Sequence, residues 1–253
     1  MKSTSIFLVA ALVLALQFNS SAQTNAPADA SPHVNVAIVP VPRTGGITNR
    51  QSQVLQRAKD APGDYDVEFI GDSITQGWEG AGKNVWADLG AKYKIINFGV
   101  SGDRTEHVLW RFEQGQLDGI KAKVAVVMIG TNNSNKNKDG TWTYTDSDIL
   151  DGVTAIVNEI RRRQPDTKVL LLGIFPRGKT FNDQRGRILE INQALSRLDD
   201  GSHIYFLDIG SQFIENDGSI APGMMKDALH PGEKGYHIWA DAMQPKLTEL
   251  VGK

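Results

Sequence analysis

Serine, histidine and aspartate, three residue types that together can cleave an ester, stand in two short blocks of this chain. Ser73 ends the block Gly71-Asp72-Ser73, and Asp227 precedes His230 by three residues. A serine hydroxyl is a weak nucleophile until a neighbouring base accepts its proton and a third group holds that base in the correct tautomer. A spacing of three within a turn can bring the Asp227 carboxylate to one imidazole nitrogen and leave the other free. We therefore predict Ser73 as nucleophile, His230 as base and Asp227 as its orienting group.

Each of these residues also has a simpler interpretation. A serine that follows a strand and precedes a helix commonly caps that helix, and Asp-x-x-His occurs often without any catalytic role. The other four histidines fit the role of base less well, because they lie in a Pro-rich segment, in helical patterns or at the start of a strand: His33, His107, His237 and His203. The catalytic interpretation depends on Ser73 and His230 meeting in the fold.

Acyl transfer also needs hydrogen-bond donors aimed at the oxyanion that develops during attack. The predicted donors are the backbone N–H of Ser73, the backbone N–H of Gly102 and the side-chain amide of Asn132. A glycine lets the backbone approach a substrate closely. Gly102 could instead be a plain turn glycine, and Asn132 could form an Asx turn at a strand end. Their joint occurrence at three successive strand ends favours an oxyanion hole.

The elements that must position these residues follow from five short apolar runs. The runs are continuous rather than alternating, as in strands buried on both faces of a parallel sheet: Val67–Gly71, Ile95–Gly99, Val124–Gly130, Val169–Phe175 and Ile204–Asp208. Helical patterns lie between them, so we predict a three-layer α/β/α sandwich with right-handed crossovers. Ligands of such sheets bind beyond the carboxyl ends of the strands, where the polar residues above are found.

Helix boundaries can be placed at several positions. Thr145 with Asp148 resembles a capping box at the start of a helix that ends near the basic run 161–163. In the last helical segment, from Glu233 onward, Pro245 predicts a break between two helical pieces.

The N-terminal residues differ from the rest of the chain. Residues 1–22 have the basic, apolar and small-residue regions of a signal peptide, so we expect a secreted or periplasmic protein without stable membrane insertion. Residues 23–46 form a predicted Pro-rich arm that acts as a tether or follows the surface, and residues 47–253 form one domain. The net charge of −2 and the absence of a basic stripe argue against nucleic-acid binding. The absence of cysteine excludes thiol catalysis and cysteine-ligated metals.

The blocks resemble those of a known family. The run 69–75 (Phe-Ile-Gly-Asp-Ser-Ile-Thr), Gly102, Asn132 and the Asp227-x-x-His230 block resemble, in order and spacing, the GDSL/SGNH hydrolases. The stretch 97–111 and the run Pro176-Arg177-Gly178 are further similar to the catalytic subunits of platelet-activating-factor acetylhydrolase Ib. The resemblance implies a flavodoxin-like five-stranded parallel sheet, no metal, no cofactor and short acyl groups, above all acetyl. Those subunits are cytosolic, whereas exported relatives often deacetylate carbohydrates.

The sequence thus predicts a serine ester hydrolase acting on a small-molecule or carbohydrate ester. Alternatives are a lipolytic enzyme of the lysophospholipase or thioesterase type and a non-catalytic carbohydrate-binding module on the same fold. A phosphate loop is excluded because the run 71–77 lacks the required lysine. Asp72, Trp78 and Arg177 are further candidates for substrate contact, as are Trp86, Trp142 and the loop 134–143. No feature of the sequence specifies an oligomeric state.

Overall fold

The computed structural model of the protein describes residues 33–43 and 48–253. The predicted signal peptide (1–22), together with the first and last residues of the predicted arm, lies outside the described residues. The chain divides into one unit comprising Met1–Val34 and a second comprising Asn35–Lys253. All of the functional residues predicted above, apart from the export signal, belong to the second unit.

Five parallel strands form one sheet in the order β2-β1-β3-β4-β5. They are β1 (Gly63–Gly71), β2 (Ile95–Gly99), β3 (Ile120–Met128), β4 (Lys168–Leu172) and β5 (Ile204–Leu207). Each predicted apolar run overlaps one of these strands, so the prediction of a five-stranded parallel sheet is confirmed. The register pairs Gly71 with Gly99 on one side and with Met128 on the other. The carboxyl ends of β1, β2 and β3 therefore lie side by side.

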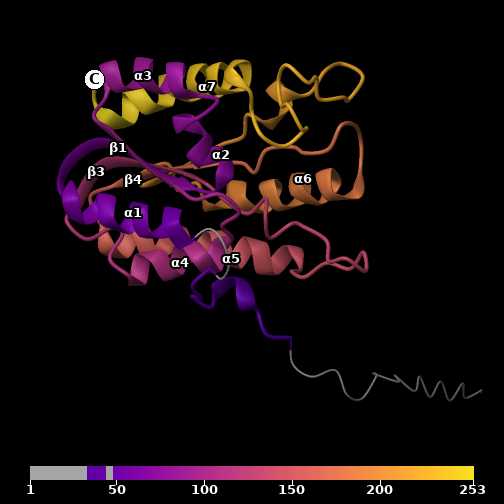
Figure 1. Ribbon diagram of the computed structural model, residues 1–253, viewed down its shortest axis with the longest axis horizontal. Helices are drawn as coiled ribbons and strands as arrows, with labels where there is room; N and C mark the ends of the chain where they lie inside the picture. Colours follow the sequence, from indigo (N-terminus) through magenta and orange to yellow (C-terminus); the bar gives the residue numbers. More distant parts are fainter. Residues whose placement is uncertain (1–32, 44–47) are drawn as a thin grey trace, which may run out of the picture. The chain divides into compact units, whose positions relative to one another are not determined.

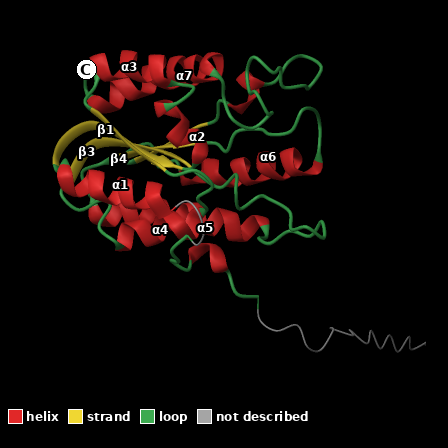
Figure 2. Cartoon of the chain, viewed as in Figure 1, coloured by secondary structure: helices red, strands yellow, loops and turns green. Residues whose placement is uncertain are grey.

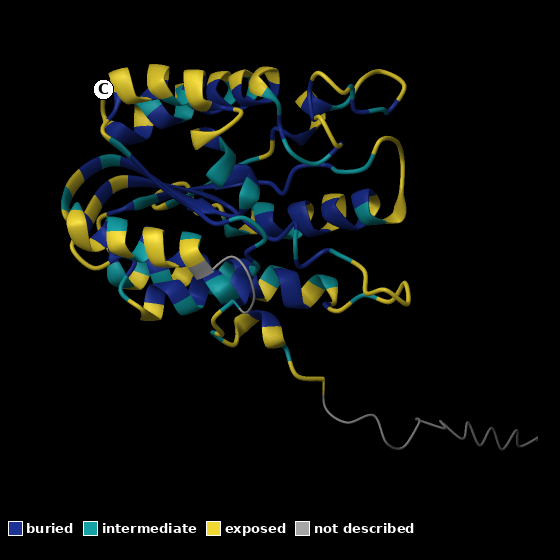
Figure 3. Ribbon diagram, in the orientation of Figure 1, coloured by how far each residue is buried: buried dark blue, intermediate teal, exposed yellow. Residues whose placement is uncertain are grey.

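Helices cover both faces of the sheet, which gives the predicted three layers (Figures 1 and 2). One face carries α2 (Ser73–Gln76), α3 (Lys83–Lys92) and α7 (Glu233–Val251), and the other carries α1 (Thr48–Asp60), α4 (Thr105–Glu113), α5 (Asp146–Arg163) and α6 (Asp183–Leu195). Short 3₁₀ segments complete the described elements: η1 (Val36–Ile38), η2 (Gly77–Glu79), η3 (Ser196–Leu198) and η4 (Gly210–Phe213). Figure 3 shows that the strands between the layers are mostly buried. Burying apolar side chains on both faces is the main source of stability for such a sheet.

The start of α5 has the predicted capping box. The Thr145 hydroxyl accepts a hydrogen bond from the Asp148 N–H at 3.1 Å, and the Asp148 carboxylate accepts one from the Thr145 N–H at 2.7 Å. Both bonds satisfy donors that the first turn of a helix leaves without intrahelical partners.

The predicted helix break at Pro245 is wrong. Helix α7 runs without interruption from Glu233 to Val251 and contains Pro245. Proline removes one backbone donor within a helix. In α7, however, Met243 and Leu247 on either side of Pro245 are fully buried against the sheet. This apolar packing holds the helix together across the missing hydrogen bond.

Residues 35–43 of the predicted arm pack onto the α4 side of the sheet. Ala37 in η1 is fully buried, and its carbonyl accepts a hydrogen bond from the Thr105 hydroxyl at 2.9 Å. The Val41 N–H donates to the Glu106 carbonyl at 3.3 Å. Residues 35–43 therefore belong to the compact unit and lead Arg43 to the loop that follows β2.

Candidate active site

Ser73 is the first residue of α2 and follows the end of β1 by two positions. Asp72 is the N-cap of α2, and its side chain accepts a hydrogen bond from the Ile74 N–H at 2.9 Å. The turn is tight: a Cβ on Gly71 would lie 2.2 Å from the Met128 carbonyl oxygen. Strand, glycine and cap together hold the Ser73 hydroxyl, half-buried, at the carboxyl edge of the sheet.

The structure joins Ser73, His230 and Asp227 in one chain of hydrogen bonds. The Ser73 Oγ lies 2.9 Å from His230 Nε2, and His230 Nδ1 lies 2.7 Å from Asp227 Oδ2. An ionised carboxylate can only accept, so Nδ1 carries the proton and Nε2 is free to accept the proton of the serine hydroxyl. The two residues predicted to meet in the fold do so across 157 positions of sequence.

Asp227 is fixed by its own turn. Its Oδ1 accepts hydrogen bonds from the His230 N–H at 2.8 Å and the Leu229 N–H at 3.1 Å. Burial opposes ionisation of Asp227, but these backbone bonds and the His230 side chain outweigh it and lower the pKa of the carboxyl. Ala228 between them has φ of 57°, a left-handed conformation that costs a non-glycine residue energy. In this strained turn the Asp227 carboxylate and the His230 imidazole face each other.

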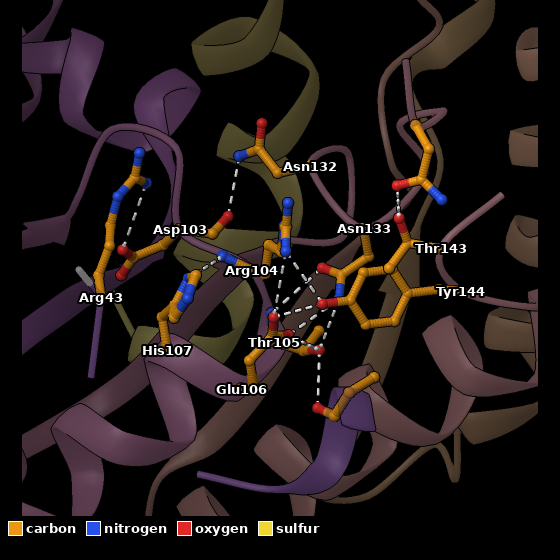
Figure 4. A network of polar contacts seen from close by, with 12 residues as sticks. Arg43, Asp103, Arg104, Thr105, Glu106, His107, Asn132, Asn133, Thr143 and Tyr144 are labelled. Atoms are coloured by element: carbon orange, nitrogen blue, oxygen red, sulfur yellow. Dashed lines mark hydrogen bonds and ion pairs between the residues drawn. The ribbon is translucent and has the colours of Figure 1, made fainter. Parts of the chain in front are cut away.

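Gly102 and Asn132 are brought together at the neighbouring strand ends. Gly102 has φ of 75°, so its left-handed backbone favours glycine. The Asn132 Nδ2 donates to the Asp103 carbonyl at 2.8 Å, which ties the loop after β3 to the loop after β2 (Figure 4). The Ser101 N–H donates to the Gln76 Oε1 at 2.7 Å. These bonds connect the loops carrying the predicted oxyanion donors to one another and to α2.

A cavity of about 460 Å³ opens at this centre. Its lining includes Ser73, Ser101 and His230. The side chain of His230 is 43 % exposed and that of Asp227 is 55 % exposed, so the relay is open to solvent. Among the described residues, no group of three or more histidine, cysteine or acidic side chains could hold a metal ion. Within the same residues, no helix is both long and apolar enough to cross a membrane.

Two of the residues considered for substrate contact are placed elsewhere by the structure. Asp72 and Trp78 are both fully buried. Trp78 packs in an aromatic cluster, with ring centroids 4.7 Å from Tyr236 and 4.8 Å from Trp239. Neither side chain presents a surface that a substrate could reach, so the expectation for these two residues is wrong. Burial raises the pKa of Asp72 to about 7, with repulsion from Asp103 adding to the effect, while the bond from Ile74 opposes it.

Arg177 does lie beside the centre. Its Nη1 donates to the Thr131 carbonyl at 3.0 Å and to the Thr131 hydroxyl at 3.2 Å, which anchors it next to Asn132. Burial lowers the pKa of its guanidinium, and the carboxylates of Asp72 and Asp227 oppose that effect. Arg177 and Asp227 line the same cavity, which has a volume of about 390 Å³.

The loop 134–143 and Trp142 border this second cavity. Lys136 and Trp142 form an isolated antiparallel bridge within the loop, and both line the cavity. The Trp142 ring has the Lys136 Nζ 4.6 Å from its centroid and the Arg187 Cζ 4.4 Å away. Trp86, by contrast, packs edge-on against Phe69 with centroids 5.1 Å apart. Of the three tryptophans considered, Trp142 alone lines this cavity.

Arg43 and Gln76 were not identified from the sequence. Arg43 Nη1 donates to the Ser101 carbonyl at 2.7 Å, and Gln76 accepts from the Ser101 N–H. A glutamine one turn beyond the nucleophile could have been noticed as a neighbour of the site. For Arg43 no signal existed, because it lies 30 positions before Ser73 in a Pro-rich segment.

Comparisons with known proteins identify similar sequences and folds. The model of the GDSL-like Lipase/Acylhydrolase family matches residues 69–238. Platelet-activating factor acetylhydrolase IB subunit alpha2 of Rattus norvegicus is 38% identical over 187 residues, covering 74% of this chain and 77% of the relative. A GDSL-like lipase from Bacteroides thetaiotaomicron superposes with a TM-score of 0.64 at 20% identity, covering 81% of this chain and 99% of that chain. A carbohydrate acetylesterase from Sinorhizobium meliloti gives a TM-score of 0.54 at 20% identity, covering 73% and 98%.

Proposed function

Because this chain belongs to the GDSL-like lipase/acylhydrolase family, we propose that it is a serine esterase that cleaves short acyl esters, acetyl esters above all, with Ser73, His230 and Asp227 as its catalytic triad. The observation that carries the proposal is the continuous relay from the Ser73 Oγ through the imidazole to the Asp227 carboxylate, with distances of 2.9 and 2.7 Å.

The proposed reaction has two steps. His230 Nε2 accepts the hydroxyl proton as Ser73 Oγ attacks the ester carbonyl, and the resulting tetrahedral intermediate expels the alcohol with a proton from His230. Water then attacks the acyl-serine, again with His230 as base, which releases the carboxylic acid and restores the hydroxyl. Asp227 stays ionised throughout and stabilises the imidazolium. Its lowered pKa suits this role.

The oxyanion is proposed to rest on the backbone N–H groups of Ser73 and Gly102 and on the Asn132 side chain. An amide nitrogen carries two protons. One proton of Asn132 Nδ2 is engaged with the Asp103 carbonyl, which leaves the second for the substrate. Donors fixed before the substrate arrives need no reorganisation during the reaction, which is why such sites accelerate acyl transfer.

The preference for acetyl rests on the relatives. The mammalian relatives at 34–38% identity are named acetylhydrolases. The likeness to the carbohydrate acetylesterase is one of fold. Support for a carbohydrate as the alcohol half comes from the cavity beside Arg177, whose lining includes Asn182, Gln184 and Trp142. The open position of His230 leaves room for a bulky alcohol.

The cellular location and two alternative functions also have to be considered. The pattern of residues 1–22 supports export, so we propose action outside the cytoplasm. The names of the mammalian relatives favour an acetylated phospholipid as a second candidate substrate. A fold retained for carbohydrate binding without turnover is the remaining alternative.

A substrate panel tests the proposal. The purified protein is assayed with p-nitrophenyl acetate, acetylated xylan, acetylated sugars and a 2-acetyl phospholipid, with Ser73→Ala as control. We expect p-nitrophenyl acetate to be hydrolysed and the activity to be lost in Ser73→Ala. Failure of the folded protein to hydrolyse any ester would favour the non-catalytic carbohydrate-binding module. Faster hydrolysis of the phospholipid than of the acetylated carbohydrates would identify the phospholipid as the substrate.

A further inference from the structure

A cavity of about 470 Å³ is lined by the loop after β2, the same loop that contributes Ser101 to the cavity that contains Ser73. Its polar lining comes from Arg43, Gly102, Arg104, Glu106 and His107. Gly102, the predicted oxyanion glycine, is thus part of this cavity, while the preceding residue Ser101 lines the one with Ser73 and His230. A substrate seated on the oxyanion hole can therefore extend into this space.

Arg43 brings a positive charge to this position. Its Nη1 donates to the Ser101 carbonyl at 2.7 Å, and a Cβ on Gly102 would lie 2.2 Å from the same nitrogen. The guanidinium thus rests directly against the Gly102 backbone, where only glycine leaves it room. Within residues 33–43 and 48–253, no acceptor is hydrogen-bonded to its Nε or Nη2.

Arg104 and His107 add further donors. Arg104 uses Nη1 to reach the Tyr144 hydroxyl at 3.2 Å, and its side chain is 40 % exposed. The Arg104 N–H donates to His107 Nδ1 at 3.0 Å, so the ring proton of His107 lies on Nε2. Burial lowers the pKa of His107 to about 4, so the ring is a neutral donor at pH 7. Figure 4 shows Arg43, Arg104 and His107 around the loop that carries Asp103.

Two carboxylates lie nearby, and among the described residues Asp103 Oδ1, the oxygen that faces Arg43, has no hydrogen-bond partner. The Glu106 carboxylate accepts from the Tyr144 hydroxyl at 2.5 Å and from the Asn133 amide at 3.1 Å. The Asp103 carboxylate is paired with the fully buried Arg111 at 2.9 Å and lies 4.0 Å from Arg43.

The charges in this region do not balance. Arg111 offsets Asp103, and Arg104, at 3.8 Å, offsets Glu106. Arg43 shares the Asp103 carboxylate with Arg111, so these three arginines and two carboxylates leave one positive charge in excess, together with several donors that have no acceptor among the described side chains. This combination fits a ligand that supplies anionic oxygen atoms.

We propose that this cavity is a substrate subsite for an anionic oxygen group, a carboxylate or a phosphate, carried by the ester that Ser73 cleaves. The inference rests on the proposed esterase function and adds the class of substrate. Arg43, supplied by the N-terminal arm, and Arg104 are its specificity-determining residues. The arm thereby contributes directly to substrate choice.

Matched esters test the subsite. On the alcohol half, 3-acetoxybenzoate and 3-acetoxyphenyl phosphate are compared with the neutral methyl 3-acetoxybenzoate. On the acyl half, p-nitrophenyl hemisuccinate is compared with p-nitrophenyl 4-methylpentanoate, which has the same shape without the charge. The measured quantity is the ratio of kcat/KM between anionic and neutral partners. We expect at least one anionic ester to be preferred about tenfold or more, as for a charge-assisted contact.

Two single variants locate the contact. Arg43→Gln and Arg104→Gln should each lower the preference ratio by about fivefold or more, because each removes a charged donor. The ratio cancels any loss of overall rate caused by loosening of the Ser101–Gly102 loop in Arg43→Gln. The control Arg162→Gln removes an equally charged side chain, 62 % exposed near the end of α5, and should leave the ratio unchanged. The pair of esters preferred by the protein identifies carboxylate or phosphate.

Ratios within twofold of one for every pair, or an unchanged ratio in both arginine variants, would overturn the subsite while leaving the esterase function intact. Calorimetry in the Ser73→Ala background provides a test that needs no turnover. There, the anionic ester preferred in the kinetic assay should bind more tightly than its neutral partner, and Arg43→Gln should remove the difference; equal binding of the two would contradict the inference. Failure of the esterase itself would instead appear as absent hydrolysis of the neutral esters.

Discussion

The side-chain amide of Asn132 donates a hydrogen bond to the main-chain carbonyl of Asp103 at 2.8 Å. This bond joins the loops that follow two neighbouring strands, β3 and β2, and fixes the orientation of the amide plane. Gly102, whose N–H is the second proposed oxyanion donor, immediately precedes Asp103 in the same loop. The two donors are therefore held relative to each other before any substrate arrives, as electrostatic preorganisation requires.

Asn132→Ala removes one of these donors. We expect kcat for p-nitrophenyl acetate to fall by about 10²–10³ with a much smaller change in KM, because the contact is made mainly in the transition state. Asn158→Ala, at an exposed position of α5, is the matched control and should retain full activity. A loss of less than tenfold in Asn132→Ala would remove Asn132 from the oxyanion hole.

Asp227→Asn tests the orientation of the imidazole. An amide at this position can donate to His230 Nδ1, which would favour the tautomer with the proton on Nε2 and abolish the acceptor needed by Ser73. We expect kcat to fall by about 10³–10⁴, the range typical of a disabled triad. The comparison is Asp217→Asn, which changes an exposed carboxylate elsewhere and should be silent. Near-normal turnover in Asp227→Asn would assign Asp227 a role in the turn alone.

The pH profile of kcat/KM should show loss of activity on the acid side of neutrality. A general base must be unprotonated to accept the serine proton, whereas the lowered pKa of Asp227 favours the ionised form of that carboxylate as the pH falls. The assay is followed from pH 4 to 8 with p-nitrophenyl acetate, and circular dichroism at each pH monitors folding. A rate that stays constant down to pH 4 would exclude His230 as the base.

Much of the fold could be predicted because its signals are local. The five apolar runs are nearly unbroken by polar residues, a pattern typical of strands buried on both faces, although β5 at the sheet edge is only half-buried. The capping box of Thr145 and Asp148 likewise needs only four consecutive residues. The residues proposed for the triad could be identified because their chemistry requires particular residue types, and the structure brings all three together.

The predictions that were wrong concern residues whose positions depend on tertiary packing. Asp72 and Trp78 lie close to the nucleophile in sequence, but Asp72 is buried as the N-cap of α2 and Trp78 is buried in an aromatic cluster with Tyr236 and Trp239. Pro245 lacks one backbone hydrogen bond, yet the buried side chains around it keep α7 continuous. Arg43 reaches the site through the path of the arm, which composition does not specify.

Glu68, in the middle of β1, should make the free energy of unfolding depend on pH. It is fully buried, and burial raises its pKa to about 8 from 4.5, with Gln164 opposing the shift. Between these two values the folded protein holds a proton that the unfolded chain releases, so the free energy of unfolding falls as pH rises through this window. Glu68→Gln stays neutral and should avoid this loss.

The measurement is urea denaturation at pH 5 and pH 8. From pH 5 to pH 8 the unmodified protein should lose free energy of unfolding that Glu68→Gln does not lose. The difference between the two proteins should be on the order of 1–3 kcal/mol. Glu113→Gln, at an exposed position of α4, should show no such difference. Parallel pH dependence in Glu68→Gln and the unmodified protein would mean that Glu68 is ionised in the folded state.

Covalent labelling of the nucleophile tests the central claim most directly. The protein is incubated with diisopropyl fluorophosphate, and intact-mass measurement, peptide mapping and residual esterase activity are followed together. We predict one adduct per chain, located on Ser73, formed in step with the loss of activity and absent from Ser73→Ala. An adduct on another residue that accompanies the loss of activity, or full activity in a protein labelled at Ser73, would contradict the account.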